Sequence, residues 1–191
     1  IPENWCWCRL GEIVKKITDG THNSPTNTPY GEYKYITAKN IKETGIDLSN
    51  ITYVSKDVHD EIFLRCNPEL NDVLLIKDGA TTGIVTVNNL AEPFSMLSSV
   101  ALIKLPEVIN PWFLTFVLRS DLFYKNLRSQ MKGTGNTRIT LKQIEPTLIP
   151  LPPLAEQKRI VRALEAILPV IDEYRKKEEE LARLILSRKI I

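Results

Sequence analysis

The sequence predicts an α+β fold: a mixed globular domain with many short strands, followed by a long C-terminal helix of the coiled-coil type. Two observations support this prediction. The first 150 residues mix many short β-rich runs, separated by Gly- and Pro-containing turns, with a few helical stretches. Beyond the prolines at 150, 152 and 153, apolar residues recur in steps of four and three. We therefore expect a globular domain at 1–150 and a proline-capped long helix at 151–191.

The expected strands lie in the first 105 residues. They are a short strand that carries Trp5 and Trp7, followed by 33–41, 51–55, Val73–Ile76, Ile84–Val87 and 98–105. A Gly-bearing turn between Val73–Ile76 and Ile84–Val87 predicts a hairpin. The segment 18–33, "TDGTHNSPTNTPYGEY", is dense in Gly, Pro, Asn, Ser and Thr. It predicts an exposed loop, which is where binding residues tend to lie.

Helical spacing begins after Asn110 and continues to about residue 131, as one helix or as two joined at Ser120-Asp121. The last helix should begin at Leu154 or Ala155, because prolines disfavour helix in the residues before them. Its apolar seam has a vacancy at Glu178 and contains Ile160, Leu164, Ile167, Ile171, Tyr174, Leu181 and Ile185.

This helix would be about 50 Å long at 1.5 Å per residue, which is more than the domain needs for its own core. A partner is therefore expected on the seam, as a dimer or partner-protein interface. The alternative is a terminal helix that folds back on its own domain. Pro169 predicts a kink or break near Ala166–Leu168, because proline removes one backbone hydrogen bond.

Composition narrows the class of protein. The chain has no run of eighteen apolar residues and does not begin with a basic patch before an apolar stretch, which predicts a soluble, cytoplasmic protein without a membrane association. Cys6, Cys8 and Cys66, with only His22 and His59 as further soft ligands, fit neither a zinc pattern nor a disulfide framework. We expect reduced cysteines and no bound metal.

The net charge of +2 favours no particular partner, but its distribution is uneven. The stretch 122–142 carries five basic residues and no acid, while acids gather near Glu178–Glu180. This pattern is compatible with a surface that faces phosphate, and also with a solvated loop of basic composition.

The junction "IPLPPLAEQKRIV" at 149–161, followed by the heptad helix, resembles the one in specificity subunits of type I restriction–modification systems. Further stretches are similar to the family's opening, first loop and strand, central hairpin and exit. They are "IPENWCWCRLGEI", "ITDGTHNSPTNTPYGEYKYITAKNI", "NDVLLIKDGATTGIV" and "GTGNTRITLKQIEPTLIPLPPLAEQ". The resemblance covers essentially the whole chain. One departure is Asn71, where the family usually has Gly, and we expect it to affect only a turn.

The resemblance implies a non-catalytic subunit that recognises one half of a split double-stranded DNA target. It also implies docking of DNA adenine methyltransferase subunits and, through them, a restriction and translocase subunit. No cofactor is expected in this chain; S-adenosylmethionine would belong to the methyltransferase, and ATP and Mg to the translocase. A full subunit of the family has two recognition domains and two long helices. One domain and one helix therefore imply either a homodimer or half of a longer subunit.

Direct readout of DNA needs side chains with paired donors and acceptors on exposed segments. The candidates for base contacts are Thr21, His22, Asn23, Ser24, Lys39, Asn40, Lys77, Thr81, Thr82, Lys132, Asn136, Thr137 and Arg138. The candidates for phosphate contacts, which set affinity and register, are Lys125, Arg128 and Lys142. For any one of these residues, an ordinary surface role is an equal alternative.

Catalytic alternatives are less well supported by the residues. His22 could act as a base, but the sequence suggests no partner for it. Asp19 with Glu32-x-Lys34 is reminiscent of metal-dependent nucleases, although such residues often occur together by chance. The Asp78–Gly83 segment could cradle a phosphate, yet it lacks the lysine and helix of a P-loop and better fits a hairpin turn.

Two rival functions remain open at this point. One is a DNA-recognition fragment of a fused restriction–methyltransferase enzyme, with its catalytic domains upstream. The other is a coiled-coil adaptor whose N-terminal domain binds protein.

Overall fold

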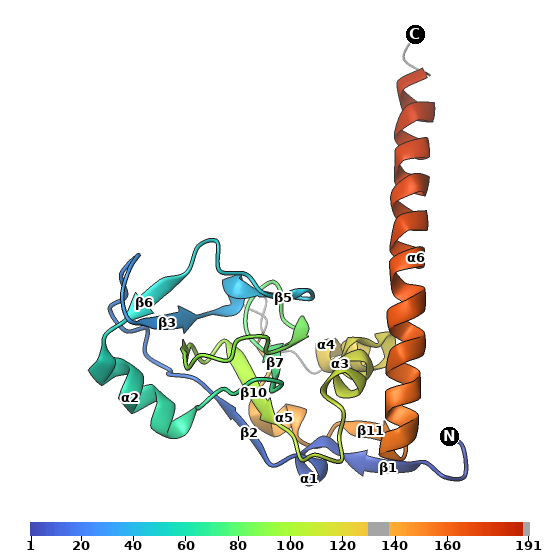
Figure 1. Cartoon of the computed structure of the whole chain (residues 1–191). Helices are drawn as coiled ribbons and strands as arrows, with labels where there is room; N and C mark the ends of the chain where they lie inside the picture. Colours follow the sequence, from blue (N-terminus) through green and yellow to red (C-terminus); the bar gives the residue numbers. More distant parts are fainter. Residues whose placement is uncertain (130–137, 189–191) are drawn as a thin grey trace.

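The structure is a computed structural model that describes residues 1–129 and 138–188, with the side chains of the last helix described as far as residue 185. A domain of many short strands and several helices carries one long helix, which projects from its side (Figure 1). The predicted α+β fold class is confirmed.

A four-stranded antiparallel sheet forms the centre of the domain, in the order β2-β10-β7-β8. Its strands are β2 (Lys16–Asp19), β7 (Val73–Ile76), β8 (Val85–Val87) and β10 (Val100–Lys104). The β7–β8 hairpin agrees with the sequence prediction, with Val73 paired to Val87. β7 is buried on both faces, which explains why it reads as a continuous apolar run rather than an alternating one.

Two hydrophobic cores lie on opposite faces of this sheet. Val73 and Leu75 point into the first core, which also contains Leu10 and residues from three later helices, whereas Leu74 and Ile76 point into the second core. The helices are α3 (Pro111–Arg119), α4 (Asp121–Ser129) and α5 (Leu141–Ile144). The predicted helical region after Asn110 is thus two helices joined at Ser120.

Smaller sheets cover the second core. A three-stranded sheet has the order β6-β3-β9, and β4 pairs with β5. These elements are β3 (Tyr33–Ile36), the 3-10 helix η1 (Ala38–Asn40), β4 (Ile41–Lys42), β5 (Gly45–Ile46), β6 (Thr52–Val54) and β9 (Ser95–Met96). The helix α2 (Lys56–Arg65), which the sequence analysis did not predict, packs against this sheet through Ile62 and the buried His59.

The first and last strands of the domain pair with each other. β1 (Cys6–Arg9) runs antiparallel to β11 (Leu148–Leu151), with Cys6 opposite Leu151 and Trp7 opposite Pro150. A single helical turn, α1 (Leu10–Ile13), follows β1. Part of the predicted proline connector is therefore a strand.

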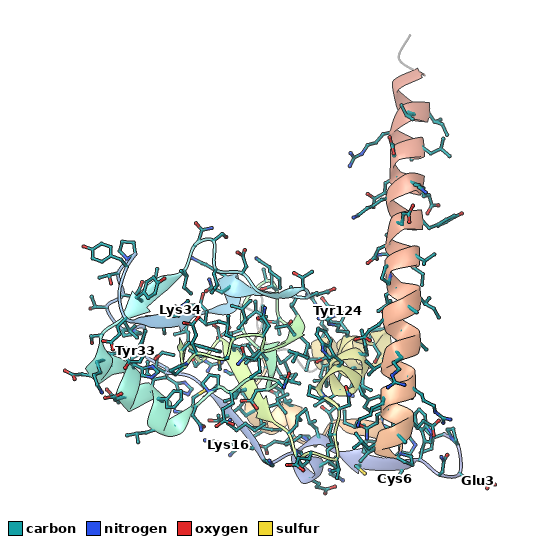
Figure 2. The ribbon with its side chains drawn as sticks, viewed as in Figure 1. Glu3, Cys6, Lys16, Tyr33, Lys34 and Tyr124 are labelled. Carbon is teal, nitrogen blue, oxygen red and sulfur yellow. The ribbon has the colours of Figure 1, made fainter. Side chains whose placement is uncertain are left out.

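The long helix α6 (Leu154–Arg188) begins where the sequence predicted. Its first turns pack on α3, where Gln157 and Val161 are buried, and the remainder extends away from the domain (Figures 1 and 2). The alternative of a helix folded back on its own domain is therefore wrong. No helix within the described residues is both long enough and apolar enough to cross a membrane.

The predicted break near Ala166–Leu168 does not occur, because α6 is continuous through Pro169 (Figure 1). Proline in a helix interior costs about 3 kcal/mol. Several uninterrupted turns on each side of Pro169 supply the remaining backbone hydrogen bonds, and this part of the helix is exposed. The local cost is thus offset within the helix itself.

Candidate nucleic-acid interface

The loops that carry most of the predicted DNA contacts meet at one edge of the central sheet. β2 ends at Asp19 opposite Ala101, while β10 begins at Val100 opposite Ile76, the last residue of β7. Antiparallel pairing therefore brings three loops to the same edge. We call this edge, formed by residues 20–24, 77–83, 97–99 and 138, the loop edge.

Backbone hydrogen bonds join these loops into one surface. The Thr21 amide donates to the Met96 carbonyl at 2.9 Å, and the Ser98 amide donates to the Thr21 carbonyl at 2.8 Å. The Lys77 amide donates to the Ser99 carbonyl, and the Ile139 amide donates to the Lys77 carbonyl, both at 2.9 Å.

Gly20 is required for this close approach of the loops. A Cβ atom at Gly20 would lie 1.8 Å from the Met96 carbonyl oxygen, which leaves no room for a side chain. The first loop therefore leaves β2 along a fixed path.

Six of the predicted base-contact residues are exposed at or near the loop edge. They are His22, Asn23, Ser24, Lys39, Thr81 and Arg138. Thr21 is half-buried, and its hydroxyl donates to the Asn23 carbonyl at 3.0 Å. Lys132, Asn136 and Thr137 lie outside the described residues.

Lys39 lies at a polar cavity of about 750 Å³ beside the first loop. Tyr35 also lines this cavity, and burial raises the pKa of its hydroxyl to about 12, so that the group keeps its proton at neutral pH.

Three predicted contact residues are corrected by their burial. Lys77 is 1% exposed, and its ammonium pairs with the buried carboxylate of Asp19 at 3.2 Å. Asn40 is also buried, and its Oδ1 accepts a hydrogen bond from the Thr37 amide at 3.0 Å. Thr82, which is 1% exposed, donates from its hydroxyl to the Gly79 carbonyl at 2.7 Å within the hairpin turn. All three side chains organise the domain rather than present donors on its surface.

The residues predicted to contact phosphate lie on α4 and α5, and all three are exposed. Arg128 stacks over the Tyr124 ring at 4.9 Å, and that ring packs so closely on Gly83 that a Cβ there would lie 2.6 Å away. Arg128 is thereby held beside the β7–β8 turn. Lys125 pairs with Asp121 on the same helix at 3.3 Å, and Lys142 lies on α5, next to the loop that contains Arg138.

The hairpin turn 78–83 is itself anchored to the loop edge. Gly79 and Gly83 adopt positive φ angles of 96° and 103°, and the Asp78 carboxylate lies 3.7 Å from the Arg138 guanidinium. The segment is a β-hairpin turn, as the sequence favoured, rather than the loop before a helix that a P-loop requires.

The sequence analysis missed Arg65 and the partners of His22. Arg65 ends α2 and donates hydrogen bonds to both Asp19 and His22, and the His22 ring also lies 3.3 Å from Asp19. A signal for α2 was present in the sequence, because Asp57 and Arg65 carry the charges favoured in a first and a last helical turn.

A nuclease centre does not form from the residues that suggested one. Asp19 is engaged with Arg65 and Lys77, whereas Lys34 pairs with Glu92 at 2.8 Å. In the described part of the chain, no group of three or more His, Cys, Asp or Glu side chains is placed to hold a metal ion.

A second surface, formed by α6, is apolar. Beyond Leu164 the predicted seam is largely exposed: Ile167 is 53% exposed, Ile171 44% and Tyr174 72%. Leu181 and Ile185 continue it, together with the exposed Leu168, Val170 and Leu184, which were not predicted. Ile160 and Leu164 instead border an apolar groove of about 610 Å³, which is also lined by Trp5, Trp7, Phe116 and Leu122.

Gln157 fixes the angle at which α6 leaves the domain. Its Oε1 accepts from the Asn110 amide at 2.8 Å, and its Nε2 donates to the carbonyls of Pro152 at 2.9 Å and Val108 at 3.2 Å. Asn110 is also the N-cap of α3, because its side chain accepts from the Phe113 amide at 3.0 Å. One buried amide thus joins the exit of the domain, the start of α3 and the first turns of α6.

Together, the loop edge and the projecting helix define a recognition module mounted on a spacer. The chain belongs to the family described as "Type I restriction modification DNA specificity domain", whose model matches residues 2–183.

Two relatives named as type I specificity subunits are similar to this chain and support its place in the family. A specificity subunit of the type I enzyme MjaVIII from Methanocaldococcus jannaschii is 29% identical over 185 residues, which are 95% of this chain and 40% of that protein. The EcoAI specificity subunit from Escherichia coli is 27% identical over 88% of this chain and 29% of its own length. The chain thus spans less than half of these relatives.

Solved structures share the fold. A chain from a study of assembly and conformational transition of the type I R-M system superposes with a TM-score of 0.73 and 26% identity, covering 96% of this chain and 44% of that one. The HsdS subunit from Thermoanaerobacter tengcongensis has a TM-score of 0.68 and 22% identity over 91% of this chain and 39% of its own.

Proposed function

We propose that this chain is a non-catalytic specificity subunit, or half of one, that reads one half of a split DNA target and positions DNA-modifying partners on it. The observation that carries this proposal is the combination of a rigidly linked loop edge with a helix whose apolar face projects from the domain. Membership in the DNA specificity family supports it.

The chemistry of the loop edge supports DNA as the ligand. Arg138 at the loop edge and the exposed Lys39, Arg65 and Arg128 outside it supply donors and positive charge. The exposed Asn23, Ser24 and Thr81 of the loop edge can hydrogen-bond to base edges. The acid that is central to this surface, Asp19, is buried and neutralised by Lys77, so it does not repel phosphate.

The seam of α6 supports pairing with an identical helix in the antiparallel sense. Its residues are arranged symmetrically about Pro169: Ile167 and Ile171 lie two residues to either side, and Leu164 and Tyr174 lie five. An antiparallel pair that crosses at Pro169 therefore places Ile167 beside Ile171 of the second copy, and Leu164 beside Tyr174. Such a pair has a twofold axis, and a symmetric dimer favours a symmetric DNA target.

Charge also favours the antiparallel orientation. Lys158, Arg159 and Arg162 precede the crossing point by about as many residues as Glu178–Glu180 follow it. Antiparallel helices bring these opposite charges together, whereas parallel helices would place the two acidic runs side by side. In the proposed assembly the two domains lie at opposite ends of the paired helices, which sets the spacing between the half-targets.

The partners in this proposal are DNA adenine methyltransferase subunits and, through them, a restriction and translocase subunit. S-adenosylmethionine belongs to the methyltransferase, and ATP and Mg belong to the translocase. This chain supplies binding and orientation. The same assembly would arise within a longer subunit that contains two such domains and two such helices.

The test is to express the chain with the adenine methyltransferase of the same restriction–modification locus and to map methylated adenines across the host DNA by single-molecule sequencing. We expect methylation at a split, palindromic motif. A soluble, co-purifying complex that leaves no new methylation would contradict a self-sufficient homodimer. It would favour a fused enzyme or an adaptor instead.

A further inference from the structure

Next to the loop edge, one buried carboxylate contacts three nitrogen-bearing side chains, which come from three separate elements. Asp19, at the end of β2, is 3% exposed. Lys77 follows β7 and pairs with its Oδ2 at 3.2 Å, while Arg65 from α2 and His22 from the first loop approach its Oδ1. We call Asp19, His22, Arg65 and Lys77 the Asp19 cluster.

Only two members of the cluster reach the surface. Lys77 is enclosed, whereas the side chain of Arg65 remains 52% exposed and that of His22 remains 48% exposed. Lys77 neutralises Asp19 within the domain. The positive charge of Arg65 is therefore not balanced inside the cluster and is presented at the loop edge.

The two exposed side chains of the cluster contact each other through nitrogen atoms. Arg65 Nη2 lies 3.0 Å from His22 Nε2, and a guanidinium can only donate hydrogen bonds. A hydrogen bond between these two atoms requires Nε2 to accept and the ring proton to lie on Nδ1, although the same Nε2 also lies 3.3 Å from Asp19 Oδ1. Both side chains then offer donors to a ligand: the remaining guanidinium N–H groups and the imidazole Nδ1–H.

We propose that Arg65 and His22 form a composite donor pair that binds an acceptor on DNA, with Asp19 as the positioning residue that aims both side chains. The acceptor is a phosphate oxygen or the O6/N7 edge of a guanine, which present the same chemistry to a donor pair. This inference rests on the proposed function and adds to it a contact that begins on α2, outside the loops that the sequence indicated.

The test measures binding of the full chain to a pool of duplexes with a randomised centre, as a function of salt. Arg65→Gln removes the charge and keeps a polar side chain, and Arg9→Gln is the matched control on β1. Loss of a phosphate contact leaves the selected motif unchanged, weakens binding about tenfold and lowers the salt slope by roughly one unit. Loss of a guanine contact instead abolishes the preference at one position, where discrimination falls by about 5- to 100-fold.

Binding by Arg65→Gln within twofold of the Arg9→Gln control at every salt concentration, with the same motif, would overturn the donor pair. Absence of duplex binding by the unmodified chain would overturn the proposed function as well. The two failures are thus distinguishable.

The positioning role of Asp19 has a separate spectroscopic test. The chain contains two histidines, His22 and His59, so the ¹⁵N signals of the imidazoles can be assigned with a His59→Gln variant. We expect His22 in the Nδ1–H form at pH 8, and a shift toward the Nε2–H form in both Asp19→Asn and Arg65→Gln. An unchanged tautomer in folded Asp19→Asn protein would refute the positioning role.

Discussion

Replacement of Gln157 by Leu should detach the base of α6 from the domain, although the side chain keeps nearly the same size. The substitution removes three hydrogen bonds, to the Asn110 amide and to the carbonyls of Pro152 and Val108. Gln157 is 1% exposed, so water has little access to the polar groups left behind. A buried donor or acceptor without a partner costs about 1–3 kcal/mol, and carbonyls tolerate the loss better than amides.

Together, the three polar groups left without a partner should lower the free energy of unfolding by about 3–5 kcal/mol, and burial of the more apolar leucine side chain offsets part of this loss. That is a large share of the roughly 5–15 kcal/mol that stabilises a typical domain. Urea unfolding followed by circular dichroism at fixed protein concentration measures the change, and Lys158→Leu, at the exposed neighbouring position, is the control. A loss below about 1 kcal/mol for Gln157→Leu would refute the view that this amide fixes the exit of the helix.

Three further predictions concern the seam, a buried histidine and a turn. Leu164→Asp with Ile171→Asp should abolish self-association in sedimentation experiments, whereas Lys176→Asp should preserve it; a double variant that still dimerises would exclude the seam as the interface. Burial lowers the pKa of His59 below its ordinary 6.5, so the unfolded state binds more protons and the free energy of unfolding should fall as the pH drops through 6.5 toward 5. A His59→Phe variant whose urea midpoints show the same dependence on pH would contradict this. Asn71 has a φ of 71°, so Asn71→Gly should change the melting temperature little, while Asn71→Val should cost about 1–2 kcal/mol; equal stability of the two variants would argue against the strained turn.

The sequence was most informative where a local pattern alone determines structure. The apolar run of β7 and the glycines after it predicted the hairpin, and the prolines before Leu154 predicted the start of α6. Asn71 has the left-handed conformation that Gly adopts freely and that Asn tolerates better than most residues.

Local patterns failed where the outcome depends on distant partners. Lys77 was predicted to contact DNA, but Asp19, 58 positions earlier in the chain, pairs with it inside the domain. The same long-range pairing brings Arg65 to the loop edge, which no spacing along the chain could indicate. The predicted break at Pro169 was wrong for the opposite reason. The local rule that proline interrupts a helix was outweighed by the many backbone hydrogen bonds of a long helix.

The pairing of β1 with β11 means that the polypeptide enters and leaves the domain at neighbouring points, beside the base of α6. The chain between these two strands therefore starts and ends at nearly the same place. Its loops can therefore differ from one protein to another while the direction of the helix is kept, provided that both strands and Gln157 are retained. Under the proposed function, such an arrangement would allow the recognition domain to be exchanged by replacing one continuous segment of the gene.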